Sequence, residues 1–203
     1  MLTRLHLVRH GEVLNPEGLV YADLPGFPLS PLGRDQARDA ARHLAGSGTT
    51  AVVSSPLDRA VETAGIIADA LDLTVTIDPR LTEWDLARRW AGVAWSDLPT
   101  VFPGELESYL EHPHDLPFSP ETIGAVAERM AAVVHDLERA HPGGIAVAVS
   151  HQDPVQALRL HLRGLPLDRL PDGPPPLASV TSLEPGDPSW TEVSRWAPAI
   201  TPA

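Results

Sequence analysis

Hydrophobic positions along the chain fall into short continuous runs and longer runs with the spacing of an amphipathic helix. The continuous apolar runs predict strands buried in a sheet, at residues 2–8, 50–54 and 145–149. A period of three to four residues predicts helices over residues 30–44, 55–71, 119–141 and 153–162. Shorter runs predict further strands at residues 74–77, 179–183 and 190–195. This order of elements predicts an α/β fold, a three-layer α/β/α sandwich with a mostly parallel sheet.

Three of the predicted helices begin at a Ser-Pro pair, at Ser30-Pro31, Ser55-Pro56 and Ser119-Pro120. Serine favours the N-cap, and proline favours the first helical position because it lacks the amide hydrogen that would go unbonded there. In the second of these helices, the residues expected to face the sheet are Leu57, Ala60, Val61, Ala64, Ile67, Ala68 and Leu71.

Residues 82–118 carry no clean period, and several prolines interrupt them. They hold three of the five tryptophans, Trp84, Trp90 and Trp95. We expect an insertion of short helices that covers the carboxyl edge of the sheet, with the tryptophans forming a small core and some lining a pocket. No linker divides the chain, so residues 1–203 are expected to form a single domain with an insertion at about 82–118.

The composition narrows the kinds of function that the chain can have. The 203 residues contain no cysteine, which excludes disulfides and thiol catalysis. The formal net charge of -12 disfavours nucleic acid and anionic membranes as partners, because both reward positive charge. No apolar run approaches the roughly 20 residues that span a bilayer, so a cytoplasmic protein is expected. Exposed tryptophans on the terminal strands would suit a homodimer.

Scarce basic groups fall at equivalent places in this acidic chain. Arg9 and His10 follow the first strand, His151 follows the strand at 145–149, and Arg59 lies in the first helical turn after the strand at 50–54. The carboxyl ends of parallel strands share one edge of a sheet, where open α/β folds bind ligands. Arginine suits phosphate, and a neutral histidine can attack phosphorus. Taken alone, His10 could be a surface turn and His151 a core histidine.

Two other groups of histidines have a structural interpretation. His6 lies within the first strand and is expected to be a structural residue of the sheet. The segment His112-Pro113-His114-Asp115 has metal-ligand residue types. The proline between its histidines and the lack of a third nearby ligand argue against a metal site, and we expect no metal and no cofactor.

Five segments, taken in chain order, resemble motifs of the histidine phosphatase (phosphoglycerate mutase-like) superfamily, branch 1. They are Leu7-Val8-Arg9-His10-Gly11-Glu12 with Asn15, Leu29-Ser30-Pro31-Leu32-Gly33 with Gln36-Ala37, Ser54 to Ala64 around Arg59, Leu81-Thr82-Glu83-Trp84, and Val149-Ser150-His151. The matches keep the family's order from about residue 5 to residue 152, and five ordered motifs make chance agreement a poor explanation.

The resemblance implies a role for each matching residue. His10 would attack phosphorus, and Arg9, Arg59 and His151 would hold the phosphate oxygens. Glu83 would protonate the leaving oxygen and then take a proton from water. Asn15 and Gln152 would supply further phosphate contacts. The implied protein is a metal-independent phosphatase that hydrolyses small phosphorylated metabolites through a phosphohistidine intermediate.

The chain departs from the family pattern beside its second histidine. Gln152-Asp153-Pro154 stands where many relatives have two glycines, and Asp23 lies near a position where glycine is common. These changes leave the substrate open. Two other functions also remain: a phosphoglycerate mutase-type phosphoryl transfer, for which 203 residues are short of the larger insertions expected, and a non-catalytic phosphate-binding module.

Overall fold

A six-stranded sheet forms the middle layer of the protein, whose computed structural model describes residues 1–199. The strands lie in the order β3-β2-β4-β1-β5-β6. Their bounds are β1 Arg4–Arg9, β2 Ala51–Ser54, β3 Val75–Ile77, β4 Ile145–Ser150, β5 Val180–Glu184 and β6 Thr191–Trp196. The first four strands of this order run parallel. Strand β5 pairs antiparallel with β1, and β6 pairs antiparallel with β5. The predicted mostly parallel sheet is confirmed.

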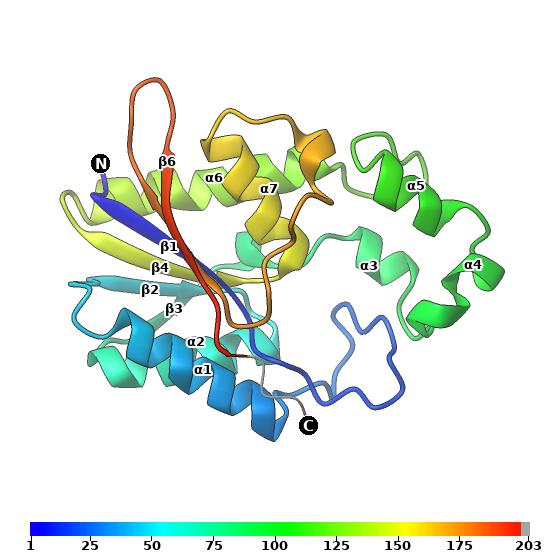
Figure 1. Cartoon of the computed structure of the whole chain (residues 1–203), viewed down its shortest axis with the longest axis horizontal. Helices are drawn as coiled ribbons and strands as arrows, with labels where there is room; N and C mark the ends of the chain where they lie inside the picture. Colours follow the sequence, from blue (N-terminus) through cyan, green and yellow to red (C-terminus); the bar gives the residue numbers. More distant parts are fainter. Residues whose placement is uncertain (200–203) are drawn as a thin grey trace.

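Helices cover both faces of the sheet, with α1 and α2 on one face and α6 and α7 on the other (Figure 1). Their bounds are α1 Pro31–Leu44, α2 Asp58–Leu71, α6 Ile123–Ala140 and α7 Gln152–Leu162. Strand β4 shows how the two cores form, because its alternating side chains point to opposite faces. Ala146 and Ala148 pack in the cluster with α6 and α7, whereas Val147 and Val149 pack in the cluster with α1 and α2.

Only one of the three Ser-Pro pairs starts a helix as predicted. Ser30 caps α1 by accepting a hydrogen bond from the Gly33 amide at 2.9 Å. Helix α2 begins at Asp58 rather than at Ser55-Pro56, with Leu57 as its N-cap. The Ser55 hydroxyl accepts a hydrogen bond from the Leu57 amide at 3.3 Å and also contacts a histidine. Helix α6 begins at Ile123, three residues after the third pair, with Thr122 as its N-cap.

The predicted inward stripe of α2 is wrong at Val61, which is exposed. Arg59 and Thr63 are buried on this helix, although a hydrophobic pattern gives them no inward role. The buried face of α2 is therefore polar at these two positions, which lie near the carboxyl edge of the sheet. The polar pair at the start of the helix therefore has a function other than core formation.

Two glycines let the loop after β1 lie directly against the start of α1. A Cβ atom on Gly33 would come within 2.0 Å of the Glu12 carbonyl oxygen, and one on Gly11 within 2.4 Å of the Gly33 carbonyl oxygen. The Ser30 amide donates to the same Glu12 carbonyl at 2.9 Å. This close approach fixes the backbone on the carboxyl side of His10.

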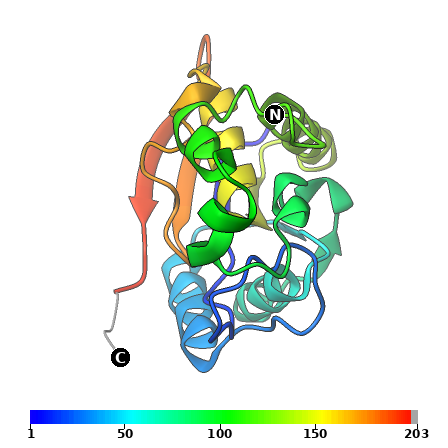
Figure 2. The ribbon, with the colours of Figure 1, turned by 90° about the vertical axis from the view of Figure 1, so that its right-hand side faces the viewer.

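Residues 82–118 form short helices beyond the carboxyl edge of the sheet, as predicted (Figures 1 and 2). The helices are α3 Leu86–Arg89, α4 Leu98–Val101 and α5 Glu105–Glu111. Trp84 and Trp90 are buried here, and each indole donates a hydrogen bond, to the Glu121 carbonyl at 2.7 Å and to Glu105 at 2.9 Å. The predicted small core is confirmed for these two tryptophans, whereas Trp95 is partly exposed.

His6 is buried within the sheet, where it was expected to be structural. It pairs in register with Ser182 of β5, and its Nδ1 lies 2.9 Å from the Ser182 hydroxyl. Burial, with a smaller contribution from the charge of Arg4, lowers its pKa to about 4. In the described part of the chain, no helix has the length and apolar character needed to cross a membrane.

Candidate active site

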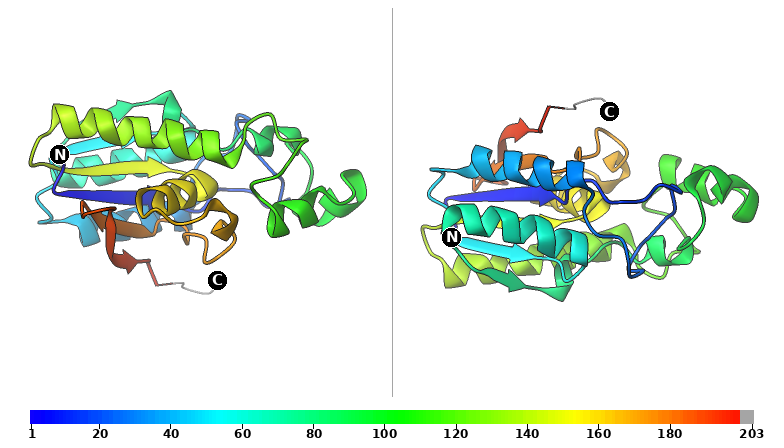
Figure 3. Two further views of the ribbon diagram at one scale, coloured as in Figure 1. Left: turned by 90° about the horizontal axis from the view of Figure 1, so that it is seen from above. Right: turned by 90° about the horizontal axis from the view of Figure 1, so that it is seen from below.

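The carboxyl ends of β1, β2 and β4 meet at the edge of the sheet that the insertion faces (Figure 3). Arg9 ends β1 and lies in register with Ser150, the last residue of β4. His10 and His151 follow these two residues, and their rings lie edge to face with centroids 5.2 Å apart. Arg59 reaches the same place from the first turn of α2. The fold therefore brings these basic groups together at one edge of the sheet, as predicted.

His10 is held as a neutral imidazole with a defined tautomer. Its Nδ1 lies 2.7 Å from the Gly11 carbonyl oxygen, which can only accept, so Nδ1 carries the hydrogen. Nε2 therefore carries a lone pair and no hydrogen, and it accepts a hydrogen bond from the Arg59 Nε at 3.3 Å. Burial, followed by the charges of Arg59 and Arg9, lowers the pKa of His10 well below its usual value.

Arg59 is a buried cation that forms no ion pair with the described residues. Only 2% of its surface is exposed, and its Nη2 donates to the Ala22 carbonyl at 2.8 Å. Its guanidinium lies 4.6 Å from the centre of the Tyr21 ring. A cation in the first turn of a helix also faces the positive end of the helix dipole. Both facts indicate a site that is completed by an anion.

Arg9 is the second guanidinium of the site. Its Nη1 donates to the Pro175 carbonyl at 2.9 Å, and its Nε is buried without a partner among the described residues. Two guanidiniums without carboxylate partners stand out in a chain of net charge -12. The fork of donors that each presents matches the oxygens of a phosphate group.

His151 lies behind the ring of His10 at the N-cap of α7. Its Nε2 is 2.8 Å from the Ser55 hydroxyl, and its Nδ1 is buried without a partner among residues 1–199. Burial and the neighbouring charges of Arg59, His10 and Arg9 lower its pKa well below the usual value.

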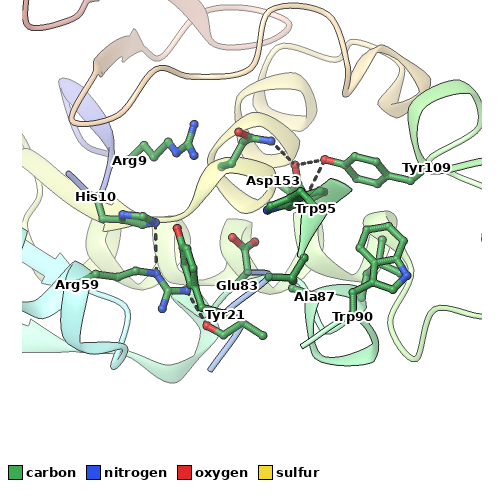
Figure 4. A pocket seen from close by; sticks show the side chains of 14 residues that line it. Arg9, His10, Tyr21, Arg59, Glu83, Ala87, Trp90, Trp95, Tyr109 and Asp153 are labelled. Atoms are coloured by element: carbon green, nitrogen blue, oxygen red, sulfur yellow. Dashed lines mark hydrogen bonds between the residues drawn. The ribbon is translucent and has the colours of Figure 1, made fainter. Parts of the chain in front are cut away.

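Glu83 faces the same cavity from the start of the insertion, just after the short helical turn Pro79–Leu81 (Figure 4). Its Oε1 accepts a hydrogen bond from the Trp84 amide at 2.8 Å. Burial, and then the negative charge of Asp153, raise its pKa to about 7. Burial raises the pKa of Asp153 as well, and the hydrogen bond that the Tyr109 hydroxyl donates to it at 3.0 Å opposes this rise. A pKa of about 7 lets Glu83 hold a proton near neutral pH.

The cavity beside these groups encloses about 650 Å³ of empty space, with the open solvent at its mouth included. Arg9, His10, Arg59 and Glu83 line one part of it. The remaining wall comes largely from the loop before α1, from the insertion and from the start of α7: Val20, Tyr21, Ala22, Leu86, Ala87, Trp90, Trp95, Tyr109, Gln152 and Asp153.

The two residues expected to add phosphate contacts differ in position. Gln152 lines the cavity, with its side-chain amide 3.5 Å from Asp153. Asn15 lines a neighbouring surface hollow together with Arg9 and Tyr21. Its side chain closes its own loop, donating to the Leu19 carbonyl at 2.8 Å and accepting from the Leu19 amide at 3.0 Å. The structure thus uses the Asn15 amide to shape the loop that carries Tyr21.

Sequence reasoning did not assign a role to Tyr21, Tyr109, Ser55 or Asp153. Asp153 had a signal, since it is the acidic residue beside His151 where glycine is common in relatives. Ser55 had a signal too, although it was interpreted as a helix cap. The two tyrosines lie in segments without periodicity, so only the fold shows that they reach the cavity.

Fold and site together define an α/β protein with an oxyanion site beside a neutral, buried histidine. The model of the histidine phosphatase superfamily (branch 1) matches residues 5–197. The chain belongs to this superfamily.

Two relatives with a named activity are phosphatases. The chain is 33% identical over 175 residues to a glucosyl-3-phosphoglycerate phosphatase of Mycolicibacterium vanbaalenii, which covers 83% of this chain and 77% of the relative. It is 31% identical over 170 residues to phosphoserine phosphatase 1 of Hydrogenobacter thermophilus, covering 83% and 80%. An uncharacterized protein of Mycobacterium tuberculosis is 43% identical over 190 residues, 89% of each chain.

Solved structures agree with this relationship. A mycobacterial glucosyl-3-phosphoglycerate phosphatase in complex with VO3 superposes with a TM-score of 0.86 at 30% identity, covering 97% of this chain and all of that one. The three-layer sandwich is therefore the fold of histidine phosphatases.

Proposed function

We propose that this protein is a metal-independent phosphatase that hydrolyses small phosphomonoesters through a phosphohistidine on His10. The single observation that carries the proposal is the state of His10. Its Nε2 is unprotonated, its pKa is lowered, and two guanidiniums without carboxylate partners stand beside it, one of them donating a hydrogen bond to Nε2. This combination supplies a neutral nucleophile and the positive charge that a phosphoryl group in transfer needs.

In the first step, the Nε2 lone pair forms a bond to phosphorus while the bond from phosphorus to the ester oxygen breaks. The leaving oxygen takes the proton of Glu83, whose raised pKa keeps that proton available near neutral pH. Arg9 and Arg59 bind the oxygens of the transferring group, and the Nδ1 of His151, which is buried without a partner among the described residues, adds a third contact.

In the second step, the Glu83 carboxylate takes a proton from water. The water oxygen then bonds to phosphorus as the bond to Nε2 breaks. Inorganic phosphate leaves, His10 is again neutral, and Glu83 is again protonated. The two steps return every group to its starting state, and their charge is balanced by arginine and histidine side chains alone.

The direct test is hydrolysis of an activated aryl phosphate with and without a chelator. We expect turnover that the chelator leaves unchanged, because the proposed steps use only side chains of this chain. Turnover that requires an added divalent metal would contradict the proposal. Failure to hydrolyse the aryl ester, combined with phosphoryl transfer from a bisphosphoglycerate to a phosphoglycerate, would identify a mutase instead. Phosphate binding with neither reaction would identify a binding module.

A further inference from the structure

The two ends of the cavity have opposite chemical character. Among its described lining residues, the basic ones are Arg9, His10 and Arg59, all at the end where the phosphate would bind. The other end is lined by the rings of Trp90, Trp95 and Tyr109 and by the carboxylate of Asp153 (Figure 4). The alcohol part of a substrate would therefore meet aromatic and acidic groups.

Asp153 is fixed at this end by its neighbours. The Tyr109 hydroxyl, from α5 of the insertion, lies 3.0 and 3.2 Å from its two carboxylate oxygens. The side-chain amide of Gln152 lies 3.5 Å from one of them. A carboxylate in the first turn of α7 is also stabilised by the helix dipole. Each oxygen keeps a free lone pair, so Asp153 can accept a further hydrogen bond from a bound molecule.

The arginines of the insertion do not offset this charge. Arg88 pairs with Asp23 at 2.9 Å and with Asp85 at 3.3 Å. Arg89 pairs with Glu105 at 2.5 Å and lies over the ring of Phe102. The charge of Arg9 acts on Asp153, but Arg9 belongs to the phosphate end of the cavity. A carboxylate or a second phosphate at the other end would thus lie against Asp153, with no further cation among the described lining residues to pair with it.

Building on the proposed phosphatase, we propose that Asp153 determines the substrate class. The enzyme acts on phosphomonoesters whose alcohol part offers a hydroxyl or ammonium donor to Asp153, and it discriminates against esters that place a carboxylate there. The aromatic rings make apolar contacts with the carbon skeleton of the alcohol part, and Asp153 accepts a hydrogen bond from its polar group. A buried acceptor such as Asp153 weakens the binding of a ligand that leaves it without a hydrogen bond, and of a ligand that places a negative charge beside it.

Two matched pairs of phosphate esters test the proposal. Glycerol 3-phosphate has a hydroxymethyl group at the position where 3-phosphoglycerate has a carboxylate. Ethanolamine phosphate and phosphoglycolate differ by an ammonium-bearing carbon against a carboxylate. We expect kcat/KM to favour the first member of each pair by at least about tenfold, because like charges in a cavity repel strongly. Equal values, or a preference for the carboxylate esters, would overturn the assignment.

Asp153→Asn isolates the charge, since asparagine keeps the size of the side chain and its acceptor oxygen. For each pair, kcat/KM of the first ester divided by kcat/KM of the carboxylate ester is expected to fall at least about fivefold. A ratio cancels any effect that the substitution has on the chemical step shared by both esters. The matched control is Asp69→Asn, which removes an exposed charge on α2 outside the cavity. Its ratios are expected to equal those of the wild type.

Binding separates this inference from the proposed function. The four esters are titrated by calorimetry into His10→Ala, which cannot form the phosphohistidine. We expect His10→Ala to bind the first ester of each pair more tightly than the carboxylate ester, whether or not the wild type hydrolyses them. A protein that hydrolyses the aryl phosphate but binds both members of each pair equally would contradict the role of Asp153 alone. A protein that discriminates in binding but shows no turnover would contradict the phosphatase alone.

Discussion

Replacing His10 with alanine is expected to lower kcat/KM for an activated aryl phosphate by at least about 10⁴-fold. The reason is that Nε2 of this residue forms the bond to phosphorus, and the described residues that line the cavity include no other histidine. The loss should be in kcat, with the affinity for inorganic phosphate largely retained, because the guanidiniums remain. Steady-state kinetics and phosphate titration measure the two quantities.

The control for this substitution is His6→Gln, which replaces a second buried histidine of β1. His6 contacts Ser182 in the sheet and does not line the cavity, so kcat/KM is expected to stay within about threefold of the wild type. Circular dichroism shows whether each variant is folded. Residual activity above a few per cent in folded His10→Ala would remove His10 as the nucleophile.

Glu83→Gln is expected to separate esters by the quality of their leaving group. Alkyl phosphates depend on protonation of a basic leaving oxygen, so their kcat/KM should fall by about 10²- to 10⁴-fold. For an activated aryl phosphate, whose phenolate leaves without a proton, release of the first product should fall much less. Glu107→Gln, an exposed residue of α5, is the control and should change neither rate. Equal losses for the two kinds of ester would mean that Glu83 is not the acid.

The raised pKa of Glu83 also predicts how the rate depends on pH. Above about 7 the free enzyme loses the proton that the leaving oxygen needs, so kcat/KM for an alkyl phosphate should fall about tenfold per pH unit. The second ionisation of a phosphate ester lies near 6 and does not produce a fall in this range. A pH series from 6 to 9 measures the decline, and Glu83→Gln should lack it. A flat wild-type profile to pH 9 would contradict the assignment.

The sequence predicted those features that depend on local pattern. The strands at 145–149 and 50–54 could be identified because a buried parallel strand is a continuous apolar run. The positions of His10, Arg59 and His151 followed from the strand ends, because parallel strands bring their carboxyl ends together. Glu83 came from the resemblance alone, since an acidic residue in a loop carries no physical signal.

The features that escaped prediction depend on tertiary contacts. Ser55 has the residue type of a helix cap, and only the position of His151 shows that its hydroxyl serves the site. Tyr109 reaches Asp153 because the insertion folds back over the sheet edge, which no periodicity within the insertion encodes. The substrate end of the cavity is for this reason visible only in the structure, whereas the phosphate end is visible in the sequence.

The measurement that tests the central claim most directly is detection of the phosphorylated enzyme. Glu83→Gln is mixed with an activated aryl phosphate, so that phosphorylation proceeds while hydrolysis of the intermediate is slowed. The protein is then digested under mildly basic conditions and examined by mass spectrometry. We predict a phosphoryl group on His10, attached at Nε2, and none in a variant that also carries His10→Ala. A phosphoryl group on another residue, or rapid turnover with an unmodified His10 throughout, would contradict the account.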